Sequence, residues 1–217
     1  LLELGQDYMR AGLFDRAENL FREIKETKLH VRAALTNLLV IYEKERDWAS
    51  CLEVTDQLQS LTGEKRDLQK SHYYCELALA ARADGRLVEA NAHLKRARAA
   101  FRGCVRANHL QAQFAAAQGD HAEAIRILRE TADKDAEYLP EILPELVQNY
   151  RQAGELKALR EFLESIAAKH PGAGAELPLA DLVFVRRGRI PRTSSGKMQR
   201  SAVRSRYLDG SIERMSS

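Results

Sequence analysis

Gly119-Asp-His-Ala-Glu-Ala124 is one of five short stretches in which a turn residue is followed, five positions later, by a small or apolar residue. The other four stretches are Gly12-Leu-Phe-Asp-Arg-Ala17, Arg46-Asp-Trp-Ala-Ser-Cys51, Gly85-Arg-Leu-Val-Glu-Ala90 and Gly154-Glu-Leu-Lys-Ala-Leu159. Their last residues are separated by 34, 39, 34 and 35 positions. This period is typical of a two-helix repeat, which buries its apolar face by stacking on its neighbours.

The apolar residues on either side of each turn fit two helices that share one buried side, because spacings of three and four keep side chains on one helix face. Four positions before each turn residue, the first helix carries Tyr8, Tyr42, Ala81, Ala115 and Tyr150. Four positions beyond the small residue, the second helix carries Phe21, Thr55, Leu94, Leu128 and Leu163. Glycine at four of the five turns permits the left-handed backbone that ends the first helix, and Arg46 is the exception.

Tyr in the first helix, Gly at the turn and Ala in the second helix together resemble the tetratricopeptide pattern. The sequence therefore predicts an all-α, right-handed superhelix of about five helical hairpins over residues 1–170. We expect a junction at 171–182, because two prolines and two glycines within nine residues end one element and start another. Residues 183–217 are expected to form a short basic appendage of strand, loop and helix.

Composition and charge distinguish the repeats from this appendage. With 45% hydrophobic and 30% charged residues the chain is expected to be globular, and no apolar run approaches the roughly 20 residues that span a bilayer. The net charge is +3, but residues 183–217 alone carry +7 and the remainder about −4. Because clustered cations attract phosphate groups, binding of the appendage to nucleic acid or to an anionic membrane is an alternative. We expect no specific nucleic-acid site, because the appendage has only two aromatic residues, Phe184 and Tyr207.

Several stretches extend beyond the generic repeat pattern: Leu4-Gly-Gln-Asp-Tyr8, Gly12-Leu-Phe-Asp-Arg-Ala-Glu18, Tyr73-Tyr-Cys-Glu-Leu-Ala-Leu79 and Gly174-Ala-Glu-Leu177. They resemble the cytoplasmic repeats of the lipopolysaccharide assembly protein B family, over residues 1–177. The resemblance implies a cytoplasmic adaptor at the inner face of the bacterial inner membrane. Its implied partners are the membrane protease FtsH and the lipid A deacetylase, which the adaptor directs to degradation. It implies no cofactor, and since the chain begins inside a repeat helix without Met, we expect it to be part of a longer protein.

The appendage has a different resemblance. Val183-Phe-Val-Arg-Arg-Gly-Arg-Ile-Pro-Arg-Thr-Ser-Ser-Gly-Lys-Met-Gln-Arg200 is similar to the extreme C-terminus of fatty acyl-AMP ligases. In those enzymes the lysine at the position of Lys197 offsets charge on the acyl-adenylate oxygens. Adenylation also needs a nucleotide pocket on a large preceding domain, and residues 1–182 contain no suitable Gly/Ser/Thr-rich segment. Lys197 is therefore catalytic only under the alternative in which the chain is a ligase fragment. We predict no enzyme activity. The joining of two unrelated coding segments is the more economical account of the two resemblances.

Partner-binding residues are expected on the first helix of each repeat, on the inner side of the array. Alignment on the turn residues gives Gln6, Arg10, Lys44, His72, Arg82, Arg106, His109, Gln113, Gln148 and Arg151, with Met9, Thr36 and Glu43 in the same register. Cations outnumber anions in this set, which favours an acidic or mixed-polarity peptide as the ligand. A merely solvated face is the alternative.

Cysteines and histidines give no metal or disulfide pattern. Cys51, Cys75 and Cys104 are an odd number with no close pair in the sequence, which indicates a reducing compartment and three small residues in helix packing. No two of the six histidines are three or four residues apart, so no metal site is expected. Trp48 is expected to pack in the core of its repeat.

Overall fold

The computed structural model describes residues 1–170, which form ten α-helices and one 3-10 turn, Ala136–Tyr138. The helices are α1 (Leu2–Arg10), α2 (Phe14–Glu26), α3 (Val31–Glu45), α4 (Trp48–Thr62), α5 (Asp67–Ala83), α6 (Leu87–Ala100), α7 (Val105–Ala117), α8 (His121–Lys134), α9 (Leu139–Ala153) and α10 (Leu156–Lys169). The predicted junction, the basic appendage and Lys197 lie outside the described residues and stay predictions.

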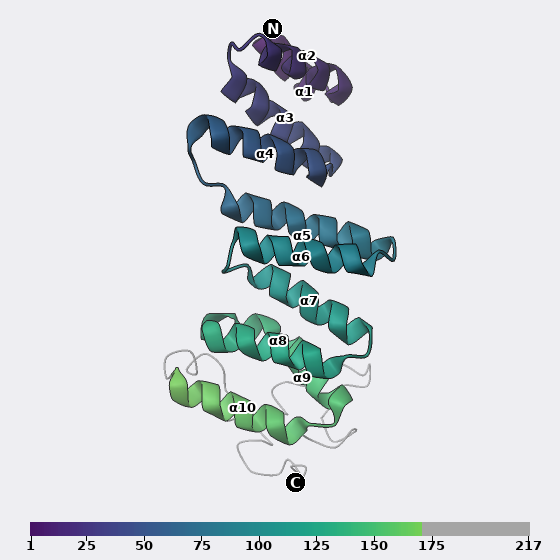
Figure 1. The fold of residues 1–217 in the computed structure, drawn as a ribbon, viewed down its shortest axis with the longest axis vertical. Coiled ribbons are helices and arrows are strands. Elements are labelled where there is room, and N and C mark those ends of the chain that lie inside the picture. The colour runs from purple at the N-terminus through teal and green to yellow at the C-terminus, as the bar shows by residue number, and fades with distance from the viewer. Residues whose placement is uncertain (171–217) are drawn as a thin grey trace, which may run out of the picture. The chain divides into compact units, whose positions relative to one another are not determined.

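Successive helices follow the predicted hairpins, which Figure 1 shows in chain order. The turn residue after each first helix has a positive φ, between 74° and 81° at Gly12, Gly85, Gly119 and Gly154. Arg46 adopts the same left-handed conformation, with φ of 58°, although its side chain makes this backbone costly. The all-α tetratricopeptide fold of five hairpins is thus confirmed within residues 1–170.

The predicted buried positions of the second helices are also confirmed. The small or apolar residue at the first turn of each second helix is completely buried: Ala17, Cys51, Ala90, Ala124 and Leu159. The positions four residues further on are exposed by 3% or less: Phe21, Thr55, Leu94, Leu128 and Leu163. The register of the repeats is therefore the one that the sequence predicts.

The first helices deviate from the predicted register at two positions. Tyr8 is only partly buried, and Gly5 is the buried residue of α1. Ala115 is only partly buried, and its neighbour Phe114 fills the core instead. The ring of Phe114 supplies in α7 the core volume that Tyr42 and Tyr150 supply in other repeats.

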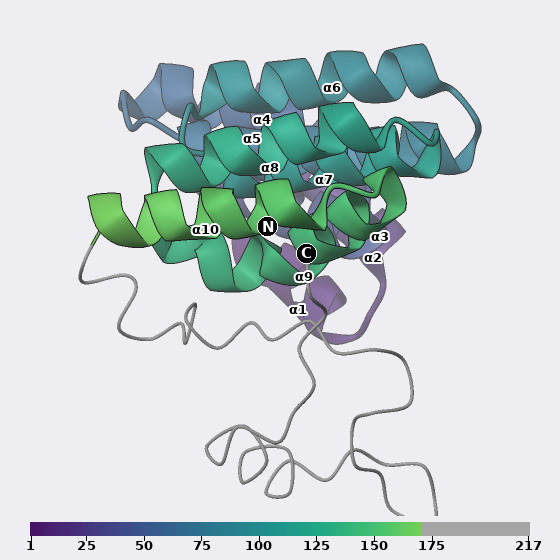
Figure 2. The ribbon, with the colours of Figure 1, turned by 90° about the horizontal axis from the view of Figure 1, so that it is seen from below.

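The chain divides into two compact units, Leu1–Leu128 and a second that begins at Arg129, within α8. In the first unit each second helix packs against the first helices before and after it: α2 against α1 and α3, α4 against α3 and α5, and α6 against α5 and α7. Figure 2 shows α6 above α5 and α7. We call α1, α3, α5 and α7 the first-helix layer of this unit. In the second unit α9 packs on α10, and the guanidinium of Arg129 lies 4.7 Å from the ring centroid of Phe162. Within residues 1–170, no helix combines the length and apolar character needed to cross a membrane.

Replacing Ala90 by Phe tests the close contact between helices. Ala90 is completely buried on α6, and the larger ring must displace its neighbours, so we expect the free energy of unfolding to fall by about 1–3 kcal/mol. Ala92→Phe is the matched control, because Ala92 is exposed on the same helix. Urea unfolding followed by circular dichroism measures both variants. Equal unfolding midpoints would contradict the repeat register.

Replacing Arg46 by Gly tests the strained turn between α3 and α4. Glycine adopts the left-handed backbone without a steric penalty but loses more entropy on folding, so we expect a net gain of about 0.5–1 kcal/mol. Glu45→Gly, one residue earlier and at the last position of α3, should instead destabilise the chain, by up to the roughly 1 kcal/mol that glycine costs within a helix. Opposite shifts in thermal midpoint are the expected result, and a destabilised Arg46→Gly would show that the side chain at this turn contributes to stability.

Candidate functional site

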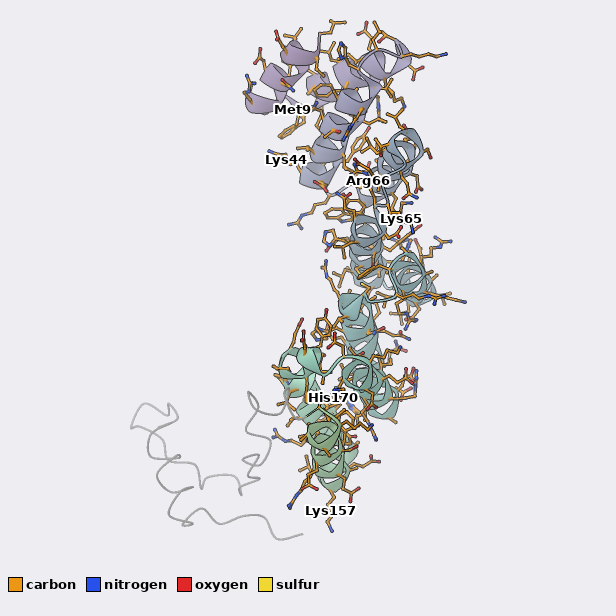
Figure 3. The ribbon with its side chains drawn as sticks, turned by 90° about the vertical axis from the view of Figure 1, so that its left-hand side faces the viewer. Met9, Lys44, Lys65, Arg66, Lys157 and His170 are labelled. Atoms are coloured by element: carbon orange, nitrogen blue, oxygen red, sulfur yellow. The ribbon has the colours of Figure 1, made fainter. Side chains whose placement is uncertain are left out.

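Eight of the predicted partner-binding residues lie on the first-helix layer of the unit Leu1–Leu128: Gln6 and Arg10 on α1, Lys44 on α3, His72 and Arg82 on α5, and Arg106, His109 and Gln113 on α7. In Figure 3, Met9 and Lys44 lie on the same side of the repeats. The other two, Gln148 and Arg151, are exposed on α9, which belongs to the second unit.

The structure brings His72 and Arg106 into direct contact between α5 and α7. Nη1 of Arg106 lies 2.7 Å from Nδ1 of His72, and Nη2 donates to Oε1 of Glu76 at 2.5 Å. The Arg106 side chain remains 44% exposed and that of Glu76 21%. A single guanidinium thus joins two groups of α5 while part of it stays accessible from outside.

A second contact joins α5 to α3. The hydroxyl of Tyr73 donates a hydrogen bond to Oε1 of Glu43. Burial of the ring, and next the hydrogen bond to the carboxylate, raise the pKa of Tyr73 above its usual range. Tyr73 therefore remains a neutral hydrogen-bond donor at physiological pH. Its acceptor, Glu43, is an exposed residue.

Trp48 connects these two contacts. The indole, at the first position of α4, stacks on Tyr73 with ring centroids 6.0 Å apart and meets His72 edge-on at 5.9 Å. It is partly buried and packs against the hydrophobic core of the first repeats, so the predicted core role is confirmed. We call the combined group the α3–α5–α7 cluster: Glu43, Trp48, His72, Tyr73, Glu76 and Arg106.

Other predicted cations contact rings rather than acids. Nζ of Lys44 lies 5.3 Å from the ring centroid of Phe14, and the guanidinium of Arg82 lies 4.3 Å from that of Phe114. Such cation–π contacts hold the long side chains against the surface of the protein.

The remaining predicted residues of the first unit make local contacts. Arg10 forms an ion pair of 2.7 Å with Asp7 on its own helix, and a ring nitrogen of His109 lies 3.4 Å from Nε2 of Gln113. Gln6 is partly buried on α1. In the part of the chain that the structure describes, no three His, Cys, Asp or Glu residues form a group that could hold a metal ion.

Sequence reasoning missed Tyr73 and Glu76 as members of the site and assigned Trp48 to the core alone. The signal was available in part: Trp48 follows a turn, and His72-Tyr73-Tyr74 places consecutive rings on a first helix. The tertiary contact was not available, because Glu43 and Tyr73 are 30 residues apart in the chain, as are Glu76 and Arg106.

Comparison with known proteins agrees with the resemblance inferred from the sequence. Lipopolysaccharide assembly protein B of Escherichia coli (strain K12) is 35% identical over 186 residues, which is 86% of this chain and 48% of that protein. Over most of its length, the chain is similar to lipopolysaccharide assembly protein B. The protein of that name from Haemophilus influenzae is 29% identical over 187 residues, 86% of this chain and 47% of the relative. The ligase alternative receives no support from these relatives.

The chain thus spans about half the length of the lipopolysaccharide assembly proteins that it matches. No protein-family model matches it. Among solved structures, a crystal structure of MamA protein aligns with a TM-score of 0.48 and 16% identity, over 85% of this chain and 96% of that one.

Replacing Tyr73 by Phe tests the contact between α3 and α5. The change removes the donor to Glu43, a charged acceptor, so we expect a loss of about 1–2 kcal/mol in the free energy of unfolding. Tyr74→Phe is the matched control, because Tyr74 is a partly buried neighbour on the same helix. Chemical unfolding should separate the two variants. Identical curves would mean that the Tyr73 hydroxyl contributes nothing to stability.

Proposed function

We propose that this chain is the repeat segment of an adaptor that binds a protein partner on the first-helix layer, with the α3–α5–α7 cluster at the centre of the site. The observation that carries the proposal is the meeting of Trp48, at the start of α4, with Tyr73 on α5 and Arg106 on α7, linked through His72. Trp, Tyr and Arg are the residue types that most often dominate the binding energy of protein interfaces.

The mutual contacts within the cluster favour binding. Arg106 is held by His72 and Glu76, and Trp48 by two neighbouring rings. Side chains that are ordered before binding lose less conformational entropy when a partner arrives. The cluster therefore presents a partly exposed surface at a low entropic cost.

The same contacts bear on the charge of the partner. Arg106 is already paired with Glu76, and Lys44 and Arg82 lie over rings, so the surface does not present a field of unpaired cations. Glu43 adds a carboxylate beside them. Of the two ligand types that the sequence leaves open, these pairings favour a mixed-polarity segment over a strongly acidic one.

Resemblance to lipopolysaccharide assembly protein B suggests the partners. We propose that they are the FtsH protease and the lipid A deacetylase, bound at the cytoplasmic face of the bacterial inner membrane. The similarity over 86% of the chain supports this assignment. The proposal gives the chain a scaffolding role, without a catalytic step or a cofactor.

Trp48 provides a direct test, because it is the only tryptophan of the chain. Titration with the purified lipid A deacetylase, and separately with the cytoplasmic part of FtsH, should change its intrinsic fluorescence on binding. Arg106→Glu breaks the contacts with His72 and Glu76 and places a second acid beside Glu76. We expect its affinity to fall at least about tenfold, equivalent to about 1.4 kcal/mol.

Arg96→Glu is the matched control for charge, because Arg96 is exposed on α6, a second helix. It should bind like the unmodified protein. Equal affinity of the Arg106→Glu and Arg96→Glu variants would remove the cluster from the binding site. Failure of both proteins to bind the unmodified chain would contradict the assigned partners.

A further inference from the structure

The folded chain brings together two cysteines that the sequence shows as unrelated. Sγ of Cys75, in the middle of α5, lies 4.0 Å from Sγ of Cys104, and the two residues are 29 positions apart. Both are free thiols. The predicted role in helix packing is confirmed for both, since Cys75 lies in the core and Cys104 packs against it, but the sequence did not reveal that the two sulfurs meet.

The two thiols differ in accessibility. Cys75 is completely buried, whereas Cys104 is only partly buried at the N-cap of α7, where the α6–α7 connection ends. A small reagent from solution therefore meets Cys104 first. Cys75 lies behind it, within the core.

The surroundings of Cys104 stabilise a thiolate. Its sulfur accepts a hydrogen bond from Cys75, which together with Ser71, the backbone N–H of Ala107 and the charge of Arg106 lowers the pKa of Cys104 to about 5, against the opposing effect of burial. The hydroxyl of Ser71 is buried and has no hydrogen-bond partner among the described residues. The N-terminus of a helix favours a negative charge in the same way.

The other two thiols keep their protons. The hydrogen bond to Cys104, followed by burial, raises the pKa of Cys75. Burial raises the pKa of Cys51 to about 12, so this third cysteine is an unreactive internal reference. Of the three cysteines, Cys104 thus combines a lowered thiol pKa with partial exposure, Cys75 lies next to it in the core, and Cys51 is buried elsewhere with a raised pKa.

We propose that Cys104 and Cys75 form a peroxide-sensitive dithiol that closes into a disulfide between α5 and α7. The Cys104 thiolate attacks a peroxide oxygen, the O–O bond breaks, and Cys104 becomes a sulfenic acid, while the departing hydroxide takes a proton from the solvent and leaves as water. The sulfur of Cys75 then attacks that of Cys104, the S–O bond breaks, and a second water carries away the proton of Cys75. Two thiols are oxidised to one disulfide, and one peroxide is reduced to two waters.

The required movement is small. A disulfide bond is about 2 Å long, so the two sulfurs must approach by roughly 2 Å. Cys104 ends the short connection between α6 and α7, and its backbone N–H is held there by the carbonyl of Phe101 at 3.0 Å. Closing the bond would tie α7 to α5 beside Glu76 and Arg106, each of which is one or two residues from a bonded cysteine.

The test uses hydrogen peroxide on the purified chain. After exposure, the protein is denatured, its remaining thiols are alkylated, and its intact mass is measured. The reduced chain takes up three alkyl groups, whereas the oxidised chain should take up one, at Cys51, and lose two hydrogens. Peptide mapping should join the segment containing Cys75 to that containing Cys104.

Three variants separate the roles of the thiols. Cys51→Ser should form the disulfide as the unmodified protein does. Cys75→Ser, or Cys75→Ala if serine disturbs the core, should stop at a Cys104 sulfenic acid that dimedone traps. In Cys104→Ser, peroxide should oxidise Cys75 at a rate at least about tenfold lower than in the unmodified protein.

Three results would each overturn the proposal. The first is the uptake of three alkyl groups after peroxide treatment of the unmodified chain. The second is a disulfide that includes Cys51, and the third is oxidation of Cys104→Ser at the unmodified rate. Because the readout is the mass of the chain alone, the result does not depend on the proposed partner binding.

Discussion

The close approach of two helices over one small residue is the contact on which each repeat depends. Ala17, Cys51, Ala90 and Ala124 occupy this position in the first unit, and none has any exposed surface. A larger side chain would separate the helices of the hairpin and expose the apolar residues one turn further on. Because a repeat contacts only its neighbours, an error in one hairpin also weakens the two adjoining interfaces.

The same constraint produces the candidate site. Stacked hairpins bring equivalent positions of successive first helices side by side, so residues about one repeat apart in sequence become neighbours in space. The contact between Tyr73 and Glu43 joins residues 30 apart, that between Arg106 and Glu76 also 30, and that between Arg106 and His72 34. The period that buries the core is therefore also the period that assembles polar and aromatic groups on the first-helix layer.

The cysteine pair follows the same geometry with different chemistry. Cys75 lies in the interior of α5, and Cys104 caps α7, the next first helix. A position within a helix buries the thiol, while a position at a helix N-terminus exposes it partly and stabilises its negative charge. Two residues of one type therefore acquire different reactivities from their places in neighbouring repeats. Their sequence neighbours Glu76 and Arg106 belong to the cluster proposed to bind a partner.

The sequence by itself determined the helical class, the five hairpins, the left-handed turns and the buried positions of the second helices, since these depend on local spacing and on residue size. Three members of the cluster, Glu43, His72 and Arg106, were also among the residues predicted on the first helices. Tertiary structure alone decided which of them meet: that Arg106 contacts His72 and Glu76, that Trp48 serves both the core and the cluster, and that Phe114 replaces Ala115 in the core. It alone placed Cys104 against Cys75. The physical reason is that periodicity specifies the face on which a side chain lies, whereas a contact between repeats depends on how closely neighbouring helices approach and where each begins.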